Sequence, residues 1–252
     1  MRYNRQVTQK QSDLLILIPA RSGSKSIPNK NTILLSGEPL LSWTAKVAIG
    51  SDLSKNVVLS TDSNKIAQLG IELGLQVPFI RPKNLAQDRT LQLDVIKHAI
   101  VALSKNFNMK FDTIMLLQPT TPFRSRESVV KSYNYFCKYK ADTLITISDV
   151  SKFAPSTKYL AEKSLLPDLF ELELSSGEKQ TQKRGTLRQD FEQIWWRNGS
   201  IYIFNTTTLI DSNSLYGGKT IGMPTNSVES INIDTPEDLA LAKVIAGGLR
   251  NL

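Results

Sequence analysis

Basic and small residues gather directly after the first apolar run of the chain. Residues 15–31 read LILIPARSGSKSIPNKN, which places Arg21, Gly23, Lys25 and Lys30 just beyond that run. Basic side chains neutralise phosphate charge, glycine permits unusual backbone conformations, and exposed N–H groups can hold phosphate oxygens. The stretch predicts a phosphate-binding loop. It matches neither the GxxxxGK[ST] nor the GxGxxG spacing, and a basic surface turn is an equal alternative.

Two oxygen-bearing side chains near the end of the sequence have a spacing that suits a metal ion. Asn232 and Asp234 are two residues apart, so on an extended strand they would point the same way. Mg²⁺ prefers oxygen ligands and keeps several waters. Asp234 also stands directly before Thr235 and Pro236, which start a predicted helix. A simple cap of that helix is therefore an equal alternative for Asp234.

Several other kinds of chemistry lack the residues they need. His98 is the only histidine and Cys137 the only cysteine, so zinc sites lack ligands and an intramolecular disulfide is impossible. A single cysteine fits a reducing cytoplasm, and no apolar run approaches the roughly 20 residues of a membrane span. The net charge is +8, but the basic residues are scattered. A solvated surface and small anionic substrates explain this charge better than nucleic acid or a membrane.

The elements that must position these residues alternate along the chain. Apolar runs predict strands over residues 14–18, 56–61, 77–80, 112–118, 142–148, 199–205 and 227–233. Apolar periodicity and capping residues predict helices over 37–50, 63–74, 91–106, 127–139 and 236–246. This alternation predicts an α/β fold with a doubly wound, mostly parallel sheet. Ligands of such sheets bind at the carboxyl ends of the strands, where the loops described above would lie.

The domain organisation is simple. Residues 1–12 are polar and predict a disordered tail, and residues 13–252 predict one domain. A polar, irregular stretch at about 151–190 interrupts the alternation and predicts an insert. Ordered elements return after it.

Six motifs in one order carry a family resemblance. PARSGSKSIPNKN, LAQD, LLQPTTPFR, RQDF, NGSIYIF and INIDTPEDL resemble the N-acylneuraminate cytidylyltransferases, the CMP-sialic acid synthetases. The resemblance runs from about Leu14 to the end of the chain. It implies a Rossmann-like nucleotidyltransferase fold and transfer of CMP from CTP to the anomeric hydroxyl of a nine-carbon 2-keto sugar acid, with release of pyrophosphate. It also implies Mg²⁺, a homodimer joined through the insert, and a place in surface polysaccharide biosynthesis.

The same resemblance implies roles for matched residues. Those implied for the nucleotide are Arg21, Ser24, Lys25, Asn31, Arg81 and Thr90. Those implied for the sugar acid are Gln118 and Asn198. Those implied for catalysis are Lys25 and Arg188, and those for the metal are Asp234 and Asn232.

The chain departs from the family pattern at two places. The family usually has Asp-x-Asp where this chain has Asn232-Ile-Asp234, so one metal carboxylate is a neutral amide. Trp195 and Trp196 replace a single aromatic residue before the NGS motif and either shape the sugar pocket or pack in the core. The alternatives left open are activation of pseudaminate, legionaminate or Kdo by the same chemistry, and a non-catalytic nucleotide-binding homologue.

Overall fold

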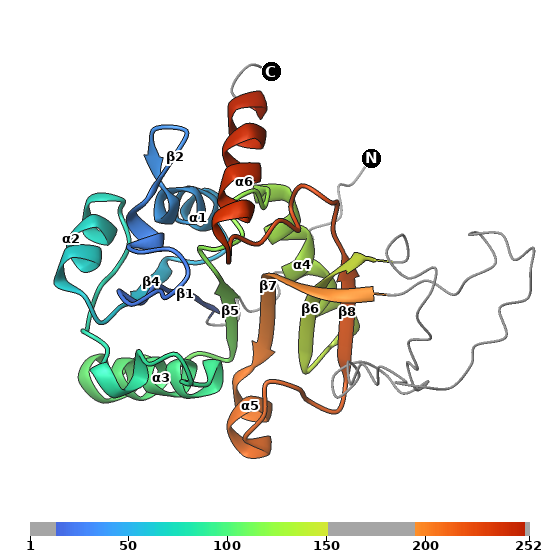
Figure 1. Ribbon diagram of the computed structural model, residues 1–252. Helices are drawn as coiled ribbons and strands as arrows, with labels where there is room; N and C mark the ends of the chain where they lie inside the picture. Colours follow the sequence, from blue (N-terminus) through green and yellow to red (C-terminus); the bar gives the residue numbers. More distant parts are fainter. Residues whose placement is uncertain (1–13, 151–194, 250–252) are drawn as a thin grey trace, which may run out of the picture.

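A computed structural model describes residues 14–150 and 195–249 (Figure 1). Within these ranges one sheet has the strand order β4-β1-β5-β7-β6-β8, and all neighbours are parallel except those of β7. The strands are β1 (Leu14–Pro19), β4 (Asn56–Ser60), β5 (Thr113–Leu117), β6 (Thr143–Asp149), β7 (Trp195–Asn205) and β8 (Thr220–Pro224). This confirms the predicted doubly wound, mostly parallel sheet.

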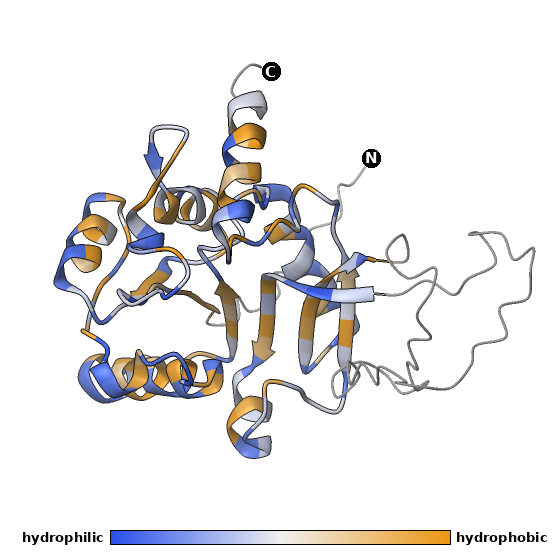
Figure 2. Cartoon of the chain, in the orientation of Figure 1, coloured by the Kyte–Doolittle hydropathy of each residue, from blue (hydrophilic) through white to orange (hydrophobic). Residues whose placement is uncertain are grey.

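The sheet is buried because helices cover both of its faces. The helices are α1 (Leu40–Gly50), α2 (Asn64–Glu72), α3 (Gln92–Phe107), α4 (Arg126–Tyr139), α5 (Thr206–Ser212) and α6 (Pro236–Leu249). One apolar cluster joins the sheet to α1, α2 and α4, and a second joins the other face to α3 and α5. Figure 2 shows the apolar strands between these helices. Apolar residues on both faces explain why the central strand β1 reads as a continuous apolar run.

Helix α6 packs outside these two layers. It stands at the top of Figure 1 and contacts a small hairpin of β2 (Leu34–Leu35) and β3 (Glu38–Pro39) through a third apolar cluster. A reciprocal capping box starts the helix: Asp238 N donates to Thr235 Oγ1, and Thr235 N donates to Asp238 Oδ2. This confirms the predicted helix start.

Strand β7 runs antiparallel to its neighbours and consists of two parts. Its second half pairs with β5 and β6 inside the sheet, whereas Trp195–Arg197 pair only with the end of β6. Between the halves lies Gly199, whose φ of 76° favours glycine, and the register with β6 shifts between Ile145 and Ile147. The first half of β7 therefore starts at the same edge at which the parallel strands end.

Some predicted elements were wrong or missed. Residues 77–80 and 227–233 form no strand, and helix α1 begins at Leu40 because the β2–β3 hairpin occupies the preceding residues. Helix α5 and strand β8 were not predicted. Neither the predicted tail at 1–12 nor the predicted insert at about 151–190 lies within the described residues. None of the helices in the described ranges is long and apolar enough to cross a membrane.

Candidate active site

Two adjoining cavities lie at the edge where β1, β4, β5 and β6 end. The narrower has a volume of about 310 Å³, and basic residues such as Arg21, Lys30 and Arg81 line it. The wider has a volume of about 550 Å³ and lies against the arm formed by β6 and the first half of β7. Gln92 and Gln118 line both cavities. The arrangement has room for two substrates that meet at these glutamines.

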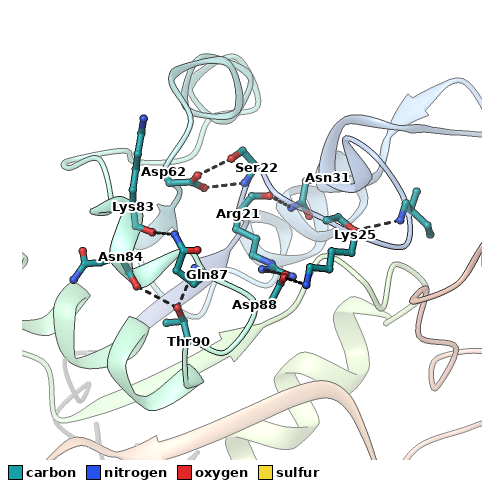
Figure 3. A network of polar contacts seen from close by, with 12 residues as sticks. Arg21, Ser22, Lys25, Asn31, Asp62, Lys83, Asn84, Gln87, Asp88 and Thr90 are labelled. Atoms are coloured by element: carbon teal, nitrogen blue, oxygen red, sulfur yellow. Dashed lines mark hydrogen bonds and ion pairs between the residues drawn. The ribbon is translucent and has the colours of Figure 1, made fainter.

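The basic loop after β1 is held by a carboxylate. Arg21 Nη1 lies 2.8 Å from Asp88 Oδ1, and Lys25 Nζ lies 2.7 Å from Asp88 Oδ2 (Figure 3). Hydrogen bonds from Lys25 and Arg21 lower the pKa of Asp88, so this side chain is ionised at neutral pH. The two cations that the family resemblance assigns to the triphosphate thus both pair with Asp88.

Further contacts fix the backbone of the same loop. Asp62, after β4, accepts hydrogen bonds from Ser22 N at 2.8 Å and from Ser22 Oγ at 2.6 Å, as Figure 3 shows. Burial alone would raise the pKa of Asp62, but the Ser22 hydrogen bonds bring it below its ordinary value. The buried Asn31 donates to Arg21 O at 2.8 Å, and Ser24 Oγ accepts from Ile27 N. These contacts preorganise the loop before any nucleotide binds.

The loop glycine does not behave as expected. Gly23 does not have a left-handed φ, and no atom lies within 4 Å of the position that a Cβ would take. The backbone of this turn therefore does not require glycine. Gly23 lines the narrow cavity, and the open space beside it lets a ligand approach the backbone closely.

Arg81 indicates where a ligand would bind. It is only 4% exposed, and its Nε and Nη2 atoms have no hydrogen-bond partner within the described residues. Burial lowers the pKa of its guanidinium, Asp62 opposes this shift and Arg21 adds to it. Buried donors without partners are costly, so a bound ligand with acceptor atoms is expected here. Thr90 lines the same cavity, and its Oγ1 accepts a hydrogen bond from Gln87 N.

Lys30 belongs to the predicted phosphate-binding loop, but no role of its own was predicted for it. Its side chain is 12% exposed and lines the narrow cavity. Its Nζ donates to Asp234 Oδ1 at 3.0 Å and to the carbonyl oxygen of Ile233 at 2.9 Å. It lies in the basic motif after β1, and its placement one residue before Asn31 was the available signal. Its contacts bring the basic loop and the predicted metal residues into one site.

The predicted metal residues lie side by side. Asn232 Nδ2 donates to Asp234 Oδ2, and the buried Asn232 Oδ1 has no partner among the described residues. The side chain of Asp234 does not cap the helix, so that alternative is wrong: Thr235 and Asp238 form the cap, Asp234 adds only its N–H to Asp238 Oδ2, and its carboxylate contacts Lys30. One carboxylate and one unpaired amide oxygen fit a hard cation that a triphosphate also coordinates. Within the described ranges no three His, Cys, Asp or Glu side chains form a metal cluster.

Gln118 is held in place at the junction of the cavities. Its Nε2 donates to Gln92 Oε1 at 3.2 Å, and its backbone carbonyl oxygen accepts from Arg124 Nη2. Arg124 is 2% exposed and also donates to Thr44 and Thr121. Burial lowers the pKa of Arg124 to about 9, although Glu229 opposes this shift. A buried cation with several acceptors is rigid, so it fixes the loop that carries Gln118.

The remaining predicted residues divide between the cavity and its support. Asn198 lines the wider cavity, but its amide donates to Ser148, Thr225 and Ser230 and accepts from Thr146 and Ser200 N, so it braces the wall. Trp196 lines this cavity and is 41% exposed, whereas Trp195 is half-buried beside it in β7. Arg188 lies outside the described residues.

A sheet-edge site with one basic cavity and one neutral cavity is typical of an enzyme that joins a nucleotide to a second substrate. Residues 15–165 match the family model described as cytidylyltransferase. The CMP-N,N′-diacetyllegionaminic acid synthase of Legionella pneumophila subsp. pneumophila is 35% identical over 237 residues, which cover 91% of this chain and 94% of that protein. The chain therefore belongs to the cytidylyltransferase family, in the group of sialic-acid-type CMP synthetases, and is an enzyme of that class.

Two further likenesses agree with this assignment. The N-acylneuraminate cytidylyltransferase of Streptococcus agalactiae serotype III is 27% identical over 226 residues, which cover 89% of this chain and 51% of that protein. The solved structure of CMP:2-keto-3-deoxy-manno-octonic acid synthetase complexed with CTP has a TM-score of 0.69 to this chain. At 18% identity, with 96% of this chain and 100% of that chain covered, it shows the fold.

Proposed function

We propose that this cytidylyltransferase transfers CMP from CTP to the anomeric hydroxyl of a nine-carbon 2-keto sugar acid and releases pyrophosphate. The observation that carries the proposal is the pair of cavities that share Gln92 and Gln118. CTP fits the basic cavity, and the sugar acid fits the wider, more neutral one. The anomeric oxygen would then meet the α-phosphorus at the two glutamines.

The chain's own residues supply charge and orientation for this reaction. Arg21 and Lys30 line the narrow cavity and neutralise the triphosphate, together with Lys25 in the hollow beside Arg21. The unpaired donors of Arg81 bind acceptor atoms of the nucleotide. Asp234 and Asn232 Oδ1 would hold Mg²⁺, which supplies charge neutralisation at the phosphates. Phosphoryl-type transfer depends mainly on such positioning and electrostatics.

The first candidate for the sugar acid is an N,N′-diacetyllegionaminic acid, because the synthase named for that acid is 35% identical to this chain. N-Acylneuraminate, pseudaminate and Kdo remain the competing acids. We also propose that the enzyme is a cytoplasmic homodimer and that Arg188 of the insert takes part in catalysis. A dimer would be seen by light scattering at micromolar concentration, and a fully active monomer would contradict it.

The test of the proposed function is pyrophosphate release from each nucleoside triphosphate with each sugar acid. We expect turnover with CTP and a nine-carbon acid, and far slower turnover with UTP, ATP and GTP. Equal release from UTP and CTP would contradict the nucleotide assignment. Absence of release with every pair, combined with tight CTP binding, would favour the non-catalytic homologue.

A further inference from the structure

The wider cavity carries a group of donors that the proposed reaction does not use. Arg197 and Tyr202 line this cavity, and Arg197 Nη1 donates to the hydroxyl oxygen of Tyr216. Tyr202 Oη lies 3.9 Å from the position that a Cβ of Gly199 would take, on the same wall. We call Arg197, Tyr202 and Tyr216 the Arg197 cluster. Arg197 lies on the first half of β7, Tyr202 on its second half, and Tyr216 on the loop after α5.

Each side chain of this cluster still has a hydrogen-bond donor to offer. The guanidinium of Arg197 has five N–H groups, of which Tyr216 engages one nitrogen. Tyr216 accepts with its oxygen and keeps its own proton to donate. Tyr202 Oη makes no hydrogen bond to any described residue, and burial raises the pKa of Tyr202 to about 12, so the phenol stays protonated at neutral pH. The cluster therefore recognises an acceptor oxygen.

The position of the cluster indicates which part of a sugar acid it faces. A Cβ at Gly199 would lie 3.7 Å from Gln118 Oε1, so Gly199 marks the junction of the cavities. Arg197 is two residues nearer the start of β7 than Gly199, which corresponds to about 6–7 Å between them at the rise of an extended strand. It lines the wide cavity and is not among the residues that line the narrow one. The carboxylate and the reacting hydroxyl share one carbon, so both stay at the junction, and Arg197 faces the distal half.

The charge of the cavity indicates the chemistry of that distal group. Among the described residues that line it, Arg197 is the one cation and Asp149 the one anion. Their formal charges cancel, so the cavity as a whole does not favour a second carboxylate. An amide carbonyl is a neutral acceptor with two lone pairs, which matches a pair of donors from Arg197 and a tyrosine.

We propose that Arg197, oriented by Tyr216, is a specificity-determining residue that binds the carbonyl oxygen of an N-acyl group on the distal half of the sugar acid. The inference rests on the proposed function and adds the group by which the enzyme tells acylated from non-acylated acids. Arg197 is exposed in the structure, but an acid that fills the cavity displaces its water, so a substrate that lacks the acceptor leaves these donors unpaired.

The test compares Arg197→Met with wild type on three nine-carbon 2-keto-3-deoxy acids at saturating CTP. One acid has two N-acetyl groups, one has a single N-acetyl group at carbon 5, and one has none. We expect Arg197→Met to lower kcat/KM at least about tenfold for the diacetylated acid and less than about twofold for the non-acylated acid. The KM for CTP should not change. Tyr216→Phe should give a smaller loss with the same order of acids.

Matched variants make the result decisive. Arg126→Met carries the same substitution at an exposed arginine on α4 and should leave all rates unchanged. If thermal unfolding shows that Arg197→Met is not folded, Arg197→Lys takes its place, because lysine keeps the charge. An equal loss on all three acids would overturn the proposal in favour of a carboxylate contact or a structural role, and no loss would overturn it outright. If wild type turns over none of the acids, the proposed function itself fails.

Discussion

Lys30 Nζ lies 3.0 Å from Asp234 Oδ1, although the two residues are 204 positions apart in the chain. The same ammonium group donates to the carbonyl oxygen of Ile233. This relationship joins the basic loop after β1 to the segment that leads into α6. The residues proposed for the phosphates and those proposed for the metal are therefore in direct contact, and Lys30 partly neutralises the carboxylate of Asp234.

The first prediction concerns the metal. Asn232→Asp adds a formal charge beside Asp234, so we expect half-maximal rate at a lower Mg²⁺ concentration than the millimolar range expected for wild type, an order of magnitude typical of few protein ligands. Asp234→Ala should abolish turnover. A Mg²⁺ titration of the rate measures both effects. Asp211→Ala, an exposed acid on α5, is the control, and wild-type turnover by Asp234→Ala would place the metal elsewhere.

The second prediction concerns Lys25. Its side chain is 85% exposed, so its loss should not affect folding. The lysine charge matters more as pyrophosphate leaves than when CTP binds. We expect Lys25→Ala to lower kcat at least about tenfold, which corresponds to about 1.4 kcal/mol of barrier. Steady-state kinetics measure this effect against Lys55→Ala, another exposed lysine. An unchanged kcat would make the loop a basic surface turn.

The third prediction concerns Asp88, which pairs with both Arg21 and Lys25. The triphosphate competes with this carboxylate for the same two cations. Asp88→Asn should therefore tighten the binding of CTP, by about threefold given the modest strength of exposed ion pairs. Calorimetric titration of CTP gives the dissociation constant, and Asp211→Asn is the isosteric control. Weaker binding in Asp88→Asn would mean that Asp88 serves chiefly to orient the cations.

The pH dependence of the ion pairs of Asp88 with Arg21 and Lys25 has a definite sign. Lys25 and Arg21 lower the pKa of Asp88 in the folded chain, so its stabilising contribution is complete above the ordinary aspartate pKa. It is lost as the pH falls through the lowered value. At neutral pH the competition with CTP is therefore fully present, and the difference between wild type and Asp88→Asn should be constant between about pH 6 and 8.

The fourth prediction compares two glycines. Gly199 has a φ of 76°, so Gly199→Ala should cost about 1–2 kcal/mol of unfolding free energy and shift the wall that faces Gln118. Gly23 has no such φ, and a Cβ added there would meet no atom within 4 Å, so Gly23→Ala should leave the free energy of unfolding unchanged. Denaturant unfolding measures both. Equal stability of the two variants would show that β7 does not need glycine at its bend.

The central strands could be predicted from sequence because each apolar run is buried on both faces. The strand predicted at residues 227–233 was wrong. Apolar and polar residues alternate there as in a strand, but Glu229 is buried because it binds the start of α4. Glu229 accepts from Ser125 N and Ser128 Oγ at the start of α4. A distant partner of this kind leaves no local pattern. Strand β8 was missed for the opposite reason, since its short sequence TIGMP has no continuous apolar run.

In the candidate site, too, features set by local sequence could be predicted and features set by distant contacts could not. One motif placed Arg21, Lys25 and Asn31 in one loop, and in the structure Arg21 lines the narrow cavity with Asn31 and an adjoining hollow with Lys25. The contacts of Lys30 with the Asp234 segment depend on how α6 packs, so no local pattern reveals them. The role of Arg197 depends on the bend of β7 at Gly199, which exists only once the strands are paired.

The cross-strand pairing of Asp149 with Trp195 also has a consequence for protein engineering. The backbone leaves the sheet and returns to it at neighbouring positions, so the two strands themselves close the intervening segment. Doubling the length of such a segment costs only about 0.6 kcal/mol of closure entropy. Corresponding segments from synthetases of other sugar acids can thus be grafted between Val150 and Trp195. Such chimaeras would keep every described residue that lines the two cavities.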